Sequence, residues 1–239
     1  MPRIKSSSRP RQPHRPRVSE WPLYNALIFR KVNRPEYVGN PVWDKARAKE
    51  WNRLEDIPVW DINSVREWSD VAAEARRSRP EKTVHVGRLF EVNVEKHSEK
   101  LEDERIKKCR VVFQGSDVKD QNRDYAIFQD LSSQPATLEA SKAVDAYGLL
   151  PGHVIETDDA EQAYVQSYLE GDVVTWIRLP PERWPASWKG MRDPVVILKR
   201  ALYGHPDSGG FWDRHSDKHL RKVGFVPVGS EWRSTNWHT

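Results

Sequence analysis

The sequence predicts an α/β fold of the α+β kind, in which helical and extended segments follow one another along a soluble chain. Hydrophobic residues make up 37% of the 239 residues and charged residues 31%, a balance typical of a globular protein that can bury a core. Apolar residues recur at helical spacing in some stretches and at the two-residue spacing of strands in others. The length allows one large domain or two small ones.

The composition also indicates the compartment. No run approaches the roughly 18 apolar residues of a membrane span. The first residues lack the apolar core of a signal peptide. The single cysteine, Cys109, excludes an internal disulfide framework and fits a reducing compartment. We therefore expect an intracellular protein, cytoplasmic and/or nuclear, with no membrane partner.

The positive charge is concentrated in the first 17 residues. This stretch carries six arginines and lysines and no acid, so residues 18–239 have a net charge of −2, although the whole chain has +4. Its prolines and serines cannot bury a core, which predicts a disordered basic tail over residues 1–20. Such a tail can neutralise nucleic-acid phosphates, serve as a nuclear import signal, or act only as a solubilising leader.

Four stretches predict helices. The pattern from 42 to 60 places tryptophans and alanine three and four residues apart and ends at Pro58. A second helix is predicted from 66 to 77, before Pro80, and another from 209 to 222. Pro135 suits the first turn of a fourth helix, which stops at Gly148. The buried stripe predicted for this helix is Leu138, Ala140, Ser141, Val144 and Tyr147.

Apolar runs between these helices predict the strands. Residues 84–94 and 110–114 form the two arms of a hairpin, with Gly87 as a bulge and the charged run 97–108 as its turn. The polar residues 116–124 predict a loop. A short strand at Val154–Ile155 leads into Asp159, and a short helix follows and stops near Gly171. Residues 173–179 and 195–198 predict two further strands.

The carboxylate of Asp159 is the first candidate site residue. At the end of a strand it would face a ligand approaching the edge of the sheet. Nucleotidyl transfer uses such carboxylates because two Mg²⁺ ions hold the attacking and the leaving oxygen. Mg²⁺ takes few protein ligands and keeps substrate phosphates in its shell, so one Asp is half a site. Considered alone, Asp158–Asp159 is more typical of a helix N-cap.

The residues around Asp159 carry a family resemblance. The run Asp158-Asp-Ala-Glu-Gln-Ala-Tyr-Val165 resembles the L-D-V-K-N-A-F-L motif of copia-type LTR-retrotransposon reverse transcriptases. The Asp, the Ala four positions later and the aromatic five positions later coincide. By this resemblance Asp159 is the catalytic metal ligand, and Tyr164 packs against the incoming sugar and excludes a ribose. Glu161 departs from the lysine that the family often has, and Tyr164 can also be an ordinary core aromatic.

Two further blocks match the same family. Lys199-Arg-Ala-Leu-Tyr-Gly204 resembles K-x-A-L-Y-G, and Trp212 and Val223-Gly-Phe225 keep the register that follows it, whereas residues 207–209 depart from Q-A-P. The resemblance places Tyr203 and Gly204 near the nucleotide and template. Lys107-Lys-Cys-Arg-Val-Val-Phe-Gln-Gly115 resembles K-A-R-L-V-A-x-G. Lys108 and Arg110 are then phosphate-binding residues of a fingers strand, although basic residues also protect ordinary edge strands.

The resemblance covers residues 44–232, including Glu50–Trp51, which is similar to the family's E-W motif. It implies the fingers and part of the palm of a right-hand polymerase, with helices packed on an antiparallel sheet. The domains expected are the tail at 1–20, a helical N-terminal segment at 21–82, and an incomplete reverse-transcriptase fingers and palm at 83–239. The cofactor and partners implied are Mg²⁺, deoxynucleoside triphosphates, an RNA/DNA template-primer and the rest of a Pol polyprotein.

The family's second metal-binding motif, Y-x-D-D, does not occur before Thr239. The chain is therefore expected to be a fragment of an RNA-directed DNA polymerase that is inactive alone, and its last residues, from about Val226, are expected to pack poorly. One alternative is a non-catalytic nucleic-acid-binding protein derived from a decayed retroelement. A zinc hydrolase using His215 and His219 is another, but the glutamate that follows the first histidine in zincins is missing.

Overall fold

The computed structural model describes residues 29–128, 137–156, 159–227 and 237–238. Its six α-helices are α1 (Arg34–Tyr37), α2 (Pro41–Asp56), α3 (Trp68–Arg77), α4 (Leu138–Gly148), α5 (Ala163–Gln166) and α6 (Ser208–Lys222). Its main strands are β1 (Phe29–Lys31), β2 (Trp60–Glu67), β3 (Val84–Lys96), β4 (Ile106–Phe113), β5 (Lys119–Asp120), β6 (Val174–Arg178) and β7 (Pro194–Leu198). The basic tail predicted at 1–20 lies outside the described residues.

A seven-stranded sheet in the order β1-β3-β6-β7-β2 organises the chain, with β4 and β5 also paired to β3. The fold is therefore α+β. The sheet was predicted to be antiparallel, and this is wrong for one pair: β3 and β6 run parallel, from Val84 opposite Val174 to Arg88 opposite Arg178. Parallel neighbours need a long crossover, and residues 97–173 supply it. Residues 29–82 contribute β1 and β2 to this same sheet.

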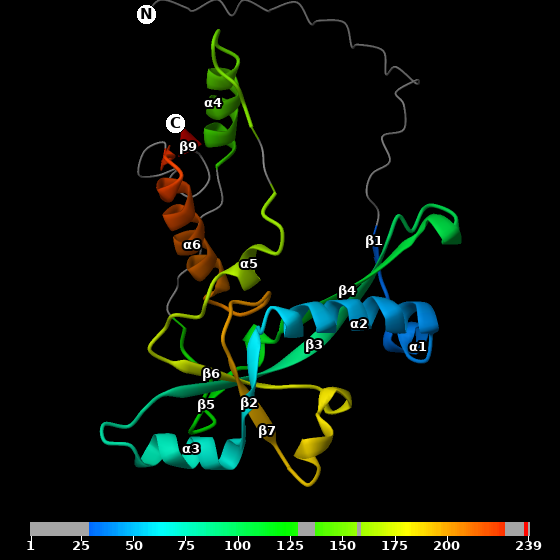
Figure 1. The fold of residues 1–239 in the computed structure, drawn as a ribbon, viewed down its shortest axis with the longest axis vertical. Helices are drawn as coiled ribbons and strands as arrows, with labels where there is room; N and C mark the ends of the chain where they lie inside the picture. Colours follow the sequence, from blue (N-terminus) through cyan, green and yellow to red (C-terminus); the bar gives the residue numbers. More distant parts are fainter. Residues whose placement is uncertain (1–28, 129–136, 157–158, 228–236, 239) are drawn as a thin grey trace, which may run out of the picture.

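Apolar side chains of the central strands point alternately to the two faces of the sheet, so both faces are apolar. Ile177, Val196 and Leu198 join the core cluster that contains Trp51 and Leu54 of α2. Their neighbours in the strands, Trp176 and Val195, pack instead with Val71 of α3. Successive strand residues point to opposite faces, so α2 and α3 cover opposite sides of the sheet. Figure 1 shows α2 lying along the β3–β4 ribbon and α3 near the far end of the sheet.

The helices with strong apolar periodicity are confirmed. Helices α2, α3 and α6 each begin within two residues of the predicted start. Asn40 caps α2, because its side-chain oxygen accepts a hydrogen bond from the Val42 N–H at 3.0 Å. The helix that Pro58 was predicted to end, α2, stops at Asp56, and Trp60, the last residue of the predicted pattern, begins β2. Helix α3 buries Val71, Ala72 and Ala75.

Gly87 does not form the predicted bulge. The register of β3 runs without a shift through this residue. The reason for a glycine is close packing: a Cβ at Gly87 would lie 2.4 Å from the ring of Phe113. The hairpin arms 84–94 and 110–114 are confirmed as β3 and β4. The predicted loop at 116–124 contains a short strand, β5, which pairs with His85 and Val86.

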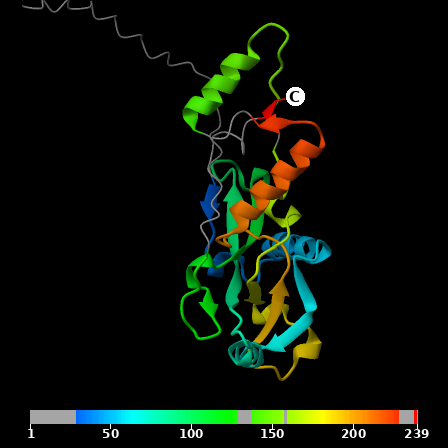
Figure 2. The same cartoon turned by 90° about the vertical axis from the view of Figure 1, so that its left-hand side faces the viewer.

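The segment between β5 and β6 differs most from prediction. Helix α4 forms and ends at Gly148, but Ala140 is its one buried residue, and Leu138 and Tyr147 are exposed. Figure 2 shows why: α4 projects beyond the sheet at the end where α6 also lies. The short helix that was predicted to stop near Gly171 ends at Gln166.

The end of the described chain forms a separate pair of strands, β8 (Val226–Pro227) and β9 (Trp237–His238). They do not join the seven-stranded sheet. Within the described residues, no helix combines the length and the apolar character needed to cross a bilayer.

Candidate nucleotide and nucleic-acid site

The end of β4 and the Tyr203–Gly204 turn are fixed against each other. The Phe113 N–H donates to the Tyr203 carbonyl at 2.8 Å. Gly204 has φ +89°, and a Cβ there would lie 2.1 Å from the Phe113 carbonyl oxygen. Gly115 faces the same turn, because a Cβ added at this position would lie 2.2 Å from the Gly204 carbonyl oxygen. These two glycines allow backbone to approach backbone, which no other residue type permits at this spacing.

Three of the predicted site residues meet beside this turn. The ring of Tyr164 lies edge-on to the ring of Tyr203, with 4.6 Å between centroids and 64° between planes. The Arg110 guanidinium carbon lies 4.8 Å from the centroid of the Tyr203 ring. Each contact contributes about 0.5–1.5 kcal/mol. Arg110, Tyr203 and Tyr164, which we call the Arg–Tyr–Tyr cluster, come from three sequence blocks that are 39 to 54 residues apart.

Helix α5, which carries Tyr164, is held by the chain that leads into the turn. The Ala201 N–H donates to Ser167 O at 3.0 Å, and the Leu169 N–H donates to Lys199 O at 2.9 Å. The Arg200 guanidinium donates to the carbonyls of Val165 and Gln166 at 3.1 and 3.2 Å. A cation at these carbonyls satisfies the C-terminal end of the helix.

Arg200 is thus a positioning residue that the sequence interpretation missed. Its guanidinium also stacks on the Tyr168 ring at 4.2 Å and donates to the Tyr168 hydroxyl at 3.0 Å. The only available sequence signal was a basic residue inside Lys199-Arg-Ala-Leu-Tyr-Gly204. Nothing in that block shows that this arginine reaches back to α5.

Lys108 and Arg110 lie on the same face of β4, since Cys109 and Val111 between and beyond them are buried on the other. The pKa of Lys108 is lowered, first by burial and then by repulsion from Lys96 and Arg110. Neighbouring cations destabilise the charged form of such a side chain, so binding of an anion stabilises it more than it would an isolated cation. Among the described strands, β4 pairs only with β3, so β4 is an edge strand. Its cations can therefore also serve to prevent pairing of this edge with another chain.

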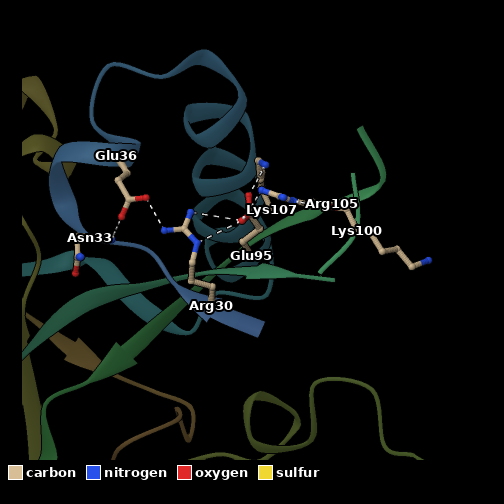
Figure 3. A network of polar contacts seen from close by, with 7 residues as sticks. All are labelled: Arg30, Asn33, Glu36, Glu95, Lys100, Arg105 and Lys107. Carbon is tan, nitrogen blue, oxygen red and sulfur yellow. Dashed lines mark hydrogen bonds and ion pairs between the residues drawn. The ribbon is translucent and has the colours of Figure 1, made fainter. Parts of the chain in front are cut away.

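Lys107, the neighbouring cation, is already neutralised. Its Nζ lies 2.6 Å from Oε1 of Glu95, whose side chain is 4% exposed. Arg30 and Arg105 approach the other carboxylate oxygen at 3.4 and 3.6 Å. Figure 3 shows these three cations converging on Glu95, with Arg30 also bound to Glu36 at 2.6 Å. Among the described residues, Lys108 and Arg110 form no ion pair, so the positive charge of β4 that the described acids do not neutralise lies at these two residues.

Glu95→Gln is expected to destabilise the fold by about 1–3 kcal/mol at neutral pH, because three cations lose their common counter-ion. The Lys107 ammonium lowers the pKa of the Glu95 carboxyl below its ordinary value of 4.5. A lowered folded-state pKa stabilises above the unfolded value and loses that contribution as pH falls through the folded one. The difference in free energy of unfolding from wild type, measured by urea denaturation, should therefore be constant above about pH 6 and shrink below about pH 4.5. Glu36→Gln, at the exposed end of the same network, should cost clearly less than Glu95→Gln, because solvent screens an exposed ion pair. Equal losses for both variants would contradict this expectation.

Asp159 is exposed and lies outside regular secondary structure, four residues before the first residue of α5. The strand predicted at Val154–Ile155 is wrong, because residues 153–156 form no strand. Ile155 packs on the end of α4 instead: a Cβ at Gly148 would lie 1.9 Å from the Ile155 side chain. The position of Asp159 at a strand end is therefore not observed, and its role as metal ligand stays a prediction.

The described residues do not assemble a two-metal centre. Among them, no group of three or more His, Cys, Asp or Glu side chains is placed to hold a metal ion. Asp158 lies outside the described residues. On α6, His215 stacks on Trp212 with 5.8 Å between ring centroids.

Comparisons of the chain with protein-family models, with curated proteins and with solved structures found no match.

Proposed function

We propose that this chain contains fingers and palm elements of a copia-type retrotransposon reverse transcriptase, and that it binds a template-primer without extending it by itself. The observation that carries the proposal is the Arg–Tyr–Tyr cluster. Sequence resemblance selected these three residues independently in three blocks, and they meet at contact distances of 4.6 and 4.8 Å. Contact between residues that come from three separate blocks supports the proposal.

The chemistry of the cluster suits a nucleotide or a nucleic-acid strand. Tyrosine rings provide stacking surfaces for bases and sugars, and Arg110 and Lys108 provide charge for phosphates. Both cations lie on one face of β4, and Arg110 is exposed. Glu95 neutralises Lys107 but forms no ion pair with either of these two within the described residues.

Binding is tested with a fluorescent RNA/DNA template-primer, whose affinity is measured by anisotropy between about 50 and 200 mM salt. Lys108→Gln/Arg110→Gln is expected to weaken binding and to lower the log–log salt slope by about 0.9 for each lost phosphate contact. Arg66→Gln is the matched control, because Arg66 lies in β2 and pairs with Glu74 of α3. An unchanged slope in the double variant, or an equal loss in the control, would contradict the proposal. The same titration without residues 1–17 measures the contribution of the basic tail.

Primer extension on an RNA template by the purified 239-residue chain is expected to be absent, because these residues contain no Y-x-D-D motif to supply the second set of metal-binding carboxylates. Gel analysis with Mg²⁺ and all four deoxynucleoside triphosphates measures this. Extension that Asp159→Ala abolishes would contradict the prediction and would assign the missing ligands to residues outside the described ranges.

A non-catalytic nucleic-acid-binding protein is the second candidate. It would use the basic residues 1–17 and the cations of β4 to bind phosphates, and it would need no catalytic carboxylates. The two candidates differ in their response to a nucleotide. A retained polymerase site predicts that a complementary deoxynucleoside triphosphate with Mg²⁺ tightens template-primer binding and that Tyr164→Ala removes this effect. A purely binding protein predicts no effect of the nucleotide.

A further inference from the structure

A cavity of about 910 Å³ lies beside β3, where the pairing of this strand with β6 ends. Its volume falls in the range of ligand sites, roughly 300–1,000 Å³. Leu89, Phe90 and Glu91 of β3 line one side of the cavity, and residues of the segment that follows β6 line another. The residues of the Arg–Tyr–Tyr cluster do not line it.

Two hydrogen bonds show which edge of β3 each residue faces. The Arg88 carbonyl accepts from the Gln114 N–H at 2.9 Å, which places residue 88 on the edge that pairs with β4. The Asn93 carbonyl accepts from the Val32 N–H at 2.9 Å, which places residue 93 on the opposite edge, beside β1. The backbone groups of successive strand residues point to alternate edges, so residues 89 and 91 also face the β1 edge.

This edge of β3 is open between two strands. β6 pairs with residues 84–88 and shares the edge with β1, because Gln114 already occupies the other edge at Arg88. β1 pairs only with residues 94–96. The next N–H that β6 could direct at the Leu89 carbonyl would belong to residue 180, and Pro180 has none. Within the described chain, the Leu89 carbonyl and the N–H and carbonyl of Glu91 therefore have no hydrogen-bond partner.

These unpaired groups fit an extended peptide. A carbonyl, an N–H and a second carbonyl in a row are the groups with which an edge strand binds an added strand. The cavity also offers apolar surface: Phe90 is 41% and Val38 53% exposed, and Tyr37 and Trp184 line the cavity with them. Such surfaces can receive the alternate side chains of a peptide.

The charge available to a ligand in the cavity is positive. Four arginines and three acids are among its described lining residues. Two of these arginines pair with two of the acids at 2.5 and 2.6 Å, which leaves Arg34 and Arg88 against Glu182. Arg88 also reaches Asp117 at 3.2 Å, but this ion pair is exposed and therefore weak. Residues 1–17 carry six cations and no acid, so charge disfavours the chain's own tail as the occupant and favours an acidic peptide.

We propose that β3 binds an extended acidic peptide of another protein at this cavity. The peptide adds a strand between β6 and β1, pairs with the backbone of Leu89 and Glu91, and places a carboxylate at Arg34 and Arg88. The proposal does not rest on the nucleic-acid site.

Hydrogen exchange of single amides, followed by NMR on the isotope-labelled full chain, tests the pairing. Without peptide, the Glu91 amide is expected to exchange at least about tenfold faster than the amides of Phe90 and Val92, which face β4. The probe is the pentapeptide acetyl-Glu-Val-Thr-Val-Glu-amide, which at saturation should slow exchange of the Glu91 amide about tenfold. A Glu91 amide that is already as protected as its neighbours, or that millimolar peptide leaves unchanged, would overturn the proposal.

Two altered peptides and two variants separate strand pairing from charge. The same peptide with N-methyl groups on its three central residues keeps its charge but loses the N–H groups of both edges, so its affinity should fall about tenfold. Lysines in place of its glutamates should weaken it similarly. Arg34→Gln/Arg88→Gln is expected to weaken the acidic peptide about fivefold. Arg66→Gln is the matched control, because Arg66 pairs with Glu74 and does not line the cavity. Equal binding of the three peptides, or equal losses in the two variants, would also overturn the proposal.

Discussion

Gly204→Ala is expected to destabilise the protein by about 2–4 kcal/mol and to abolish template-primer binding. Two costs add: an alanine at φ +89° is strained, and its Cβ would meet the Phe113 carbonyl oxygen at 2.1 Å and the Val112 side chain at 2.7 Å. The turn must move away from β4, which separates Tyr203 from Arg110. Urea denaturation gives the change in free energy of unfolding.

Gly190→Ala is the control that separates these two costs. Gly190 has a similar φ of +96°, but a Cβ there would have no atom within 4 Å. This variant should lose only about 1 kcal/mol, the cost of backbone strain. If both variants lose the same amount, the close approach of the Tyr203–Gly204 turn to β4 is not important for stability.

Trp51→Ala is expected to cost about 3–5 kcal/mol, the range for truncation of a large buried side chain. Trp51 is 0% exposed, lies edge-on to Trp60 at 5.8 Å, and carries the Arg183 guanidinium over its ring at 4.9 Å. Its indole N–H donates to Glu91 at 2.7 Å.

Trp51→Phe separates packing from the hydrogen bond. It keeps an aromatic ring in the core, and Glu91 retains Arg47 as a partner at 2.5 Å. A loss of about 1–3 kcal/mol is expected, clearly smaller than that of the alanine variant. Thermal or urea denaturation of the two variants measures the difference. Equal losses would mean that the indole N–H, and not the ring, provides the stability.

The parts of the fold that the sequence predicted are those with strong periodicity. Helices α2, α3 and α6 and strands β3, β4, β6 and β7 each carry a regular apolar pattern, so local sequence determines them. Strands β2 and β5 were missed because their sequences are polar, Trp60-Asp-Ile-Asn-Ser-Val-Arg-Glu67 and Lys119–Asp120. They are extended because of their pairing with β7 and β3, which local propensity cannot show.

The site also combines features that local sequence determines with features that depend on tertiary packing. The family resemblance selected Arg110, Tyr164 and Tyr203, but their contact depends on how the end of β4 meets the 203–204 turn. That junction rests on Gly115 and Gly204, whose close approach is a tertiary feature. The prediction of a strand before Asp159 is wrong for a related reason. Ile155 has a β-branched side chain, which favours a strand, but this side chain packs against Gly148 of α4.

The central claim is that nucleic acid binds at the Arg–Tyr–Tyr cluster, and photocrosslinking tests it most directly. A template-primer with photoreactive uridines along the template is irradiated with the full chain, and crosslinked peptides are identified by mass spectrometry. We predict crosslinks on the peptides that carry Tyr164, Tyr203 or Arg110, and their loss in Lys108→Gln/Arg110→Gln. Crosslinks confined to other parts of the chain, such as α3 or the N-terminal tail, with none on those three peptides, would contradict the account.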